Sequence, residues 1–174
     1  MTNILIVGMP GVGKTWVVRQ LLSLCNKKGR IGSKMKFHYS NKIIIPGNYT
    51  FKKHQIGYIH AGADQLSRSC ILDLPKLKFW AKNIPIVLDG RRFANKYTID
   101  ILEPYIIKIK GSGLVGRIER NKIREQYKYE SRDTKTHKEL RRHERLLSDI
   151  SEDVLVENST LALEIVKNKL KLKI

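Results

Sequence analysis

The sequence predicts an α/β protein, a three-layer fold with helices on both faces of a five-stranded parallel sheet. Short apolar runs alternate along the chain with segments whose apolar residues recur at helical spacing. A glycine-rich turn joins the first apolar run directly to the first helical segment, as in a strand–loop–helix unit. The length of 174 residues suits one domain with its own core, so we expect residues 1–174 to form a single domain.

Each element follows from a local pattern. Short runs of apolar and β-branched residues predict strands at 4–7, 35–39, 84–88, 105–109 and 154–156. Apolar residues at helical spacing, with Pro75 opening the second helix, predict helices at 15–26, 75–82, 93–102, 114–129, 136–150 and from 159 onward, with Ser159 as the last cap. Residues 27–33 are expected to be a basic loop. Residues 42–60 alternate β-prone runs with turn residues, which favours a small β-hairpin insertion.

Residues 8–15 read Gly-Met-Pro-Gly-Val-Gly-Lys-Thr and match the phosphate-binding pattern G-x-x-x-x-G-K-[ST]. We call them the phosphate loop. Their glycines let backbone N–H groups point inward at phosphate, and the following helix start adds its positive dipole end. Lys14 is expected to reach the β- and γ-phosphates and the Thr15 hydroxyl to bind Mg²⁺. The predicted nucleotide contacts here are Gly8, Gly11, Val12, Gly13, Lys14, Thr15 and Trp16; the alternative is a turn with a chance Gly-Lys-Thr.

Two carboxylates are candidates for the same site. Asp89 ends an apolar strand, where an acid beside a phosphate loop holds Mg²⁺, although it also suits a turn before Gly90. Asp64 lies in a loop between the β-prone segment and a helix. A kinase needs a carboxylate there to orient the acceptor hydroxyl and accept its proton, while the alternative is a helix cap.

Arginines and one asparagine complete the candidate set. Arg117, Arg120 and Arg124 recur on one helical face after a Gly-Ser-Gly hinge, so residues 111–135 are expected to form a lid that neutralises phosphate charge; a solvated face paired with glutamates is the alternative. Asn158 follows the last strand, where it borders the nucleoside base or simply caps a helix.

Charge points to a polyanionic partner. The formal net charge is +18, and residues 1–63 carry ten Lys or Arg and no Asp or Glu. Such a segment carries a positive field suited to DNA or RNA, with DNA preferred. The alternative is a basic protein whose substrate is a small phosphate ester.

No apolar run reaches the length of a membrane span, and two distant cysteines without ligand spacing favour a reducing, cytoplasmic compartment.

Together these motifs resemble the P-loop nucleoside and nucleotide kinases over nearly the whole chain. The matching parts are residues 8–15, the Val87-Leu88-Asp89-Gly90-Arg91-Arg92 run, the arginine-rich lid and residues 154–158. The Asp-Gly pair with nearby Arg looks like the adenylate-kinase type, without its usual proline and phenylalanine. Residues 62–67, Gly-Ala-Asp-Gln-Leu-Ser, resemble the G-x-D-x-L-S segment of small phage P-loop kinases, some of which phosphorylate 5-hydroxymethyluracil within DNA.

The resemblance implies an ATP- and Mg²⁺-dependent kinase whose acceptor is the 5-hydroxymethyl group of a modified pyrimidine in DNA, working in the host-cell cytoplasm if phage-encoded. Lys14, Asp64, Arg117 and Arg120 would act in transfer, Thr15 and Asp89 would set the metal, and the acceptor contacts would be Asp64, Arg68, Arg91, Arg92 and Arg124. A GTPase is disfavoured because no Asn-Lys-x-Asp guanine motif is present. The alternatives are a nucleoside monophosphate kinase for free nucleotides and a DNA-stimulated ATPase.

Overall fold

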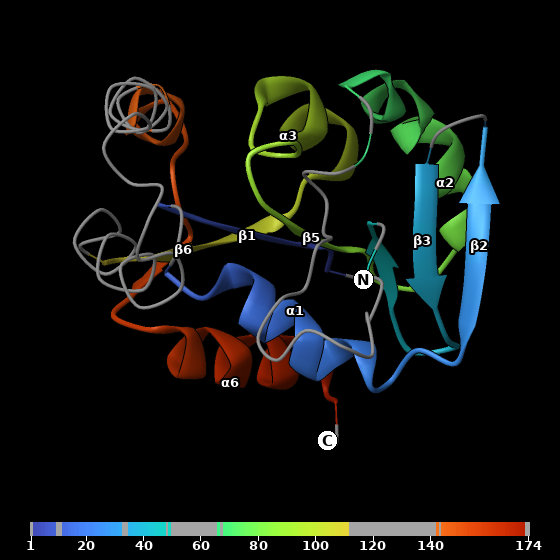
Figure 1. Ribbon diagram of the computed structural model, residues 1–174, viewed down its shortest axis with the longest axis horizontal. Helices are drawn as coiled ribbons and strands as arrows, with labels where there is room; N and C mark the ends of the chain where they lie inside the picture. The colour runs from blue at the N-terminus through green and yellow to red at the C-terminus, as the bar shows by residue number, and fades with distance from the viewer. Residues whose placement is uncertain are drawn as a thin grey trace, which may run out of the picture.

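The computed structural model describes residues 2–9, 12–32, 35–47, 49, 66, 68–111, 142 and 144–172 (Figure 1). Its centre is a four-stranded parallel sheet in the order β5-β1-β6-β7. The strands are β1 (Ile4–Gly8), β5 (Val87–Asp89), β6 (Tyr105–Ile109) and β7 (Val154–Val156). All five residues of β1 are buried, as expected of a central strand covered on both faces.

Helices cover both faces of this sheet (Figure 1). On one face, α1 (Lys14–Leu22) and α6 (Ser159–Leu170) pack on Ile4 and Ile6 of β1. On the other face, α2 (Leu74–Ala81) and α3 (Lys96–Leu102) pack on Leu5 and Val7. Successive residues of a strand point to opposite faces, so β1 alone contributes to both halves of the core. The predicted three-layer α/β architecture is therefore confirmed.

The prediction of five parallel strands is only partly met, because residues 35–39 form a strand of a separate, antiparallel sheet. This second sheet has the order β2-β3-β4, with β2 (Lys27–Ile31), β3 (Met35–Tyr39) and β4 (Ile44–Pro46). A single parallel bridge, between Ile44 and Ile86, connects it to the edge of the parallel sheet next to β5. Among the described residues, four strands form a continuous parallel ladder.

The predicted basic loop at 27–33 is wrong for residues 27–31, which are strand β2. The reason is a contact between strands: Gly29 pairs with Phe37, and a Cβ on Gly29 would lie 2.4 Å from Phe37 Cζ. A glycine within a strand marks such a close approach. Within the predicted hairpin insertion, β4 is the described strand, and it pairs with β3; residues 48 and 50–60 lie outside the described part.

Helix boundaries differ modestly from the predictions. α1 ends at Leu22 rather than at residue 26, and α3 begins at Lys96, where Asn95 caps it. Residues 68–73 form a 3₁₀ helix, η2 (Arg68–Asp73), before α2. Asn158, not Ser159, caps α6. Residues 144–148 are helical, as predicted for 136–150, whereas 114–129 and the lid beyond residue 111 lie outside the described residues. Among the described helices, none is long and apolar enough to cross a membrane.

Candidate functional site

The phosphate loop lies between the end of β1 and the start of α1. Gly8 has φ 147° and Gly13 has φ 99°, a conformation that residues with side chains rarely adopt. Close packing imposes a second requirement, because a Cβ on Gly8 would lie 2.7 Å from Ile109 O and a Cβ on Gly13 would lie 2.7 Å from Ser159 Cβ. Both positions therefore require glycine. Gly11 lies outside the described residues, and Val12 is half-buried beside the loop.

The Lys14 side chain folds back over this loop. Its Nζ donates hydrogen bonds to the carbonyls of Gly8 at 2.7 Å and Met9 at 2.8 Å. These bonds hold the ammonium group against the backbone at the end of β1, while the residue itself begins α1, the end of a helix that favours anions. Thr15 follows in the first turn of α1 and is half-buried, and the Trp16 side chain is 39% exposed.

Asp89 ends β5, the strand adjacent to β1, and pairs in register with Ile6. It is only 4% exposed, and Gly90, at φ 83°, makes the turn that follows. The structure therefore puts this carboxylate at the edge of the sheet from which the phosphate loop leaves. Carboxyl ends of neighbouring parallel strands form the ligand crevice in such sheets.

Tyr49 is a site residue that sequence reasoning missed. Its hydroxyl donates a hydrogen bond of 2.5 Å to Asp89 Oδ1, and its side chain is 1% exposed. Gly47, at φ 152°, makes room for the ring, since a Cβ there would lie 2.3 Å from Tyr49 Cε2. The pattern Pro46-Gly47-Asn48-Tyr49 indicated a turn and gave no sign of a partner forty residues away.

Basic side chains gather on one face of the β2–β3 ladder. Lys28 pairs across the strands with His38, and Arg30 pairs with Lys36. These four residues, which we call the basic face, line a hollow of about 310 Å³ together with Tyr49. Burial, with a smaller effect of Lys28, lowers the pKa of His38 below its usual value. The hollow thus connects a positively charged surface to the tyrosine that holds Asp89.

The predicted acceptor residues are only partly described. Asp64, Arg117, Arg120 and Arg124 lie outside the described residues; Arg68 begins η2, and its side chain is likewise not described.

Arg91 and Arg92 follow Gly90 in the turn after β5, Arg91 exposed and Arg92 half-buried. Burial raises the pKa of the Cys70 thiol, and the positive charge of Arg92 opposes this shift. Both arginines thus follow Asp89 in the same turn, and the Arg92 side chain is the more buried of the two.

Asn158 lies beside the phosphate loop through its neighbour Ser159, which packs on Gly13. Its Oδ1 accepts a hydrogen bond of 3.0 Å from Leu161 N. The helix-capping alternative is therefore realised, and any contact with a base would fall to the remaining amide donor.

Comparison of the chain with protein-family models, with curated proteins and with solved structures finds no match. The geometry of the site is therefore the basis for any functional conclusion.

Proposed function

We propose that this chain is an ATP- and Mg²⁺-dependent P-loop kinase that phosphorylates a hydroxyl group on DNA. One observation carries the proposal: the Lys14 amine lies over the carbonyls of Gly8 and Met9, and the buried Asp89 carboxylate ends the adjacent strand. An amine at the start of a helix and a carboxylate on the next strand are the pair that phosphoryl transfer requires.

The residues present fit a triphosphate and a magnesium ion. Gly8 and Gly13 have backbone conformations that a side chain would prevent, which allows phosphate to approach the loop closely. Lys14 would bind the phosphates, while the Thr15 hydroxyl and the Asp89 carboxylate supply the oxygen ligands that Mg²⁺ prefers. The bound ion would neutralise charge on the transferring phosphoryl group. The Tyr49 hydroxyl fixes the orientation of Asp89.

The arrangement of strands also suits this class. We propose that β4, joined to the edge of the sheet by its bridge from Ile44 to Ile86, serves as the fifth parallel strand next to β5. The strand order would then be β4-β5-β1-β6-β7, with the phosphate loop on the central strand. On its other side, β4 pairs with β3 in the antiparallel sense. In this arrangement β4 would belong to both sheets.

The basic face supports a polyanionic acceptor. Arg30 and Lys36 lie directly opposite each other in the β2–β3 ladder, and like charges in such positions destabilise a ladder. A phosphate backbone bound there would offset that repulsion. The hollow also reaches Tyr49, and through it Asp89, so DNA held on the basic face would lie near the donor site. We propose a 5-hydroxymethyl pyrimidine as the acceptor, with Asp64 orienting its hydroxyl, in a cytoplasmic setting.

The test is transfer of labelled γ-phosphate from ATP to four acceptors: hydroxymethylated DNA, unmodified DNA, RNA ends and free nucleoside monophosphates. We expect label in hydroxymethylated DNA only. Lys14→Ala and Asp89→Asn should each lower transfer by about 100-fold or more, while Lys96→Ala, 88% exposed on α3, should not change it.

The other outcomes assign other functions. Label in free nucleotides alone would identify a nucleotide kinase, and phosphate release stimulated by DNA without labelled DNA would identify an ATPase. Asp64→Asn should abolish transfer and keep ATP binding. Unchanged transfer by that variant would leave Asp64 as a helix cap.

A further inference from the structure

A second pocket lies at the opposite edge of the sheet from the phosphate loop. It has a volume of about 680 Å³, within the range of ligand sites, and it lies where β5 is about to begin, where α1 has ended and where β3 turns toward β4. We call it the amino-edge pocket. Since parallel strands begin there and the phosphate loop follows the end of β1, the two sites are separate.

An aromatic pair forms one part of the amino-edge pocket. The rings of Trp80 and Tyr39 meet edge to face at 5.0 Å between centroids, and Phe37 packs on Trp80 at the same distance. Trp80 is nevertheless 41% exposed, so its ring is held by neighbours and still open to a ligand. A rigid, partly exposed indole is a stacking platform for a nucleobase.

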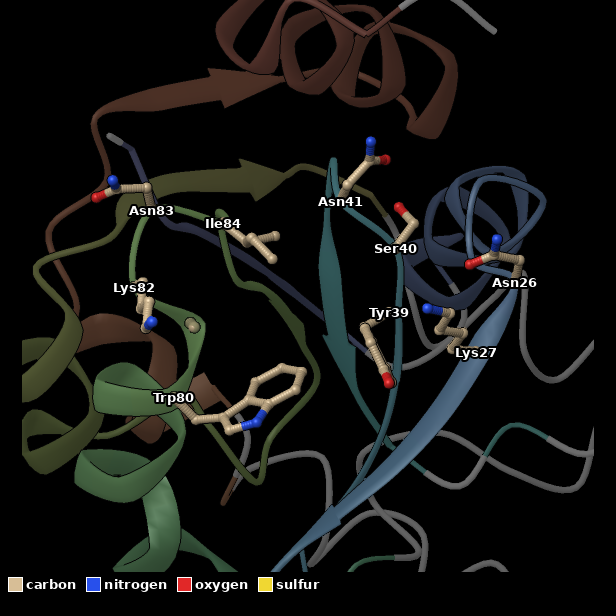
Figure 2. A pocket seen from close by; sticks show the side chains of 10 residues that line it. Asn26, Lys27, Tyr39, Ser40, Asn41, Trp80, Lys82, Asn83 and Ile84 are labelled. Atoms are coloured by element: carbon tan, nitrogen blue, oxygen red, sulfur yellow. The ribbon is translucent and has the colours of Figure 1, made fainter.

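Polar and basic groups surround this platform. Figure 2 shows Lys82 and Lys27 on opposite sides of the pocket, with Trp80 and Tyr39 between them. Asn41 and Asn83 add amide groups that both donate and accept hydrogen bonds, as the edge of a base does. No carboxylate is among the described residues that line it. Cations on two sides suit the phosphates before and after a base in a strand better than one terminal phosphate.

The backbone conformation of Lys82 is a second, independent sign that this pocket has a function. Lys82 ends α2 with φ 51° and ψ −102°, a conformation that costs energy for a residue with a side chain. Glycine would adopt it more easily. The residue at this rim of the amino-edge pocket is therefore a lysine in a conformation that glycine would adopt at lower cost.

We propose that the amino-edge pocket binds one nucleotide of a single-stranded nucleic acid, with the base stacked on Trp80 and its flanking phosphates on Lys27 and Lys82. This site is distinct from the phosphate loop and does not depend on phosphoryl transfer. It would hold a strand at the side of the molecule away from the donor nucleotide.

The experiment measures binding of a fluorescein-labelled twelve-residue oligothymidylate by anisotropy over a range of salt concentrations, using the full chain and a Lys14→Ala chain. Trp80→Leu keeps apolar packing but removes the indole face, and it should weaken binding by about 5- to 150-fold. Phe79→Leu is the matched control, because Phe79 is the adjacent residue, 87% exposed, and does not line the pocket. Binding should persist in the Lys14→Ala chain.

Lys82→Gly separates binding from folding. It should raise the melting temperature and yet reduce the slope of log K against log salt by about 0.7. Lys171→Gly is the control, since Lys171 also has φ 51° at a helix end but does not line the pocket; it should raise stability with no change in the slope.

Three results would overturn the assignment. The first is equal affinity in Trp80→Leu and Phe79→Leu. The second is thymidine monophosphate binding as tightly as the oligonucleotide, which would show that no strand is recognised. The third is a change of oligomeric state in Trp80→Leu with oligonucleotide affinity unaltered, which would identify a contact between copies of the chain.

Discussion

The contact between Tyr49 and Asp89 gives the sharpest test of how the buried Asp89 carboxylate is held. Tyr49→Phe removes only the hydroxyl that donates to Asp89 Oδ1 at 2.5 Å, and both side chains are almost inaccessible, at 1% and 4% exposed. Losing a buried hydrogen bond of this kind costs about 1–3 kcal/mol of the free energy of unfolding. For a chain of this length, that corresponds to a fall of about 2–12 °C in melting temperature.

The assay is urea denaturation and thermal melting of Tyr49→Phe beside Tyr97→Phe, whose side chain is 40% exposed on α3 and which should change stability by less than about 0.5 kcal/mol. A double-mutant cycle with Asp89→Asn should give a coupling free energy above about 0.5 kcal/mol. If the proposed phosphoryl transfer is measured, the Tyr49→Phe variant should require a higher Mg²⁺ concentration for half-maximal activity. Equal stability of the two phenylalanine variants, with no coupling, would falsify the reasoning.

Three further predictions concern the rest of the fold. Gly29→Ala should destabilise the β2–β3 ladder by about 1–3 kcal/mol, because its Cβ meets the Phe37 ring, and Phe37→Leu should recover part of that loss in urea denaturation. Asn158→Ala should cost about 0.5–2 kcal/mol in thermal melting, whereas Asn158→Asp retains the cap. Burial raises the pKa of Cys25 to about 11, which favours the uncharged thiol. Alkylation of folded Cys25, followed by peptide mass mapping, should therefore be slow at pH 8 and still rising at pH 9.5; a plateau below pH 9.5 would contradict this.

The local parts of the fold could be predicted from the sequence. The unit of strand, phosphate loop and helix was found because its pattern lies within consecutive residues, and residues 105–109 and 154–156 form strands at the predicted bounds. Apolar periodicity also identified α2 and α6 to within a residue or two. The position of Asp89 at the end of a strand was predicted correctly because the apolar run before it consists of its own neighbours.

Contacts between distant residues could not be predicted in the same way. Gly29 suggested a loop, since only its pairing with Phe37 makes a glycine suitable inside β2. Residues 35–39 were correctly predicted as a strand. Whether that strand joins the parallel or the antiparallel sheet depends on partners that the pattern does not reveal. The pairing of Tyr49 with Asp89 and the gathering of basic side chains on one face have the same origin, because each depends on how separate strands meet.

The packing of Gly13 on Ser159 has a consequence for how the protein is made. The phosphate loop belongs to the first elements of the chain, but the residue that packs on it begins the last helix. β7 and α6 must therefore leave the ribosome before the loop acquires its native neighbours. Such non-local closure slows folding and leaves the early strands waiting for partners during synthesis. The nucleotide binding proposed above should accordingly require that α6 has already been synthesised and folded.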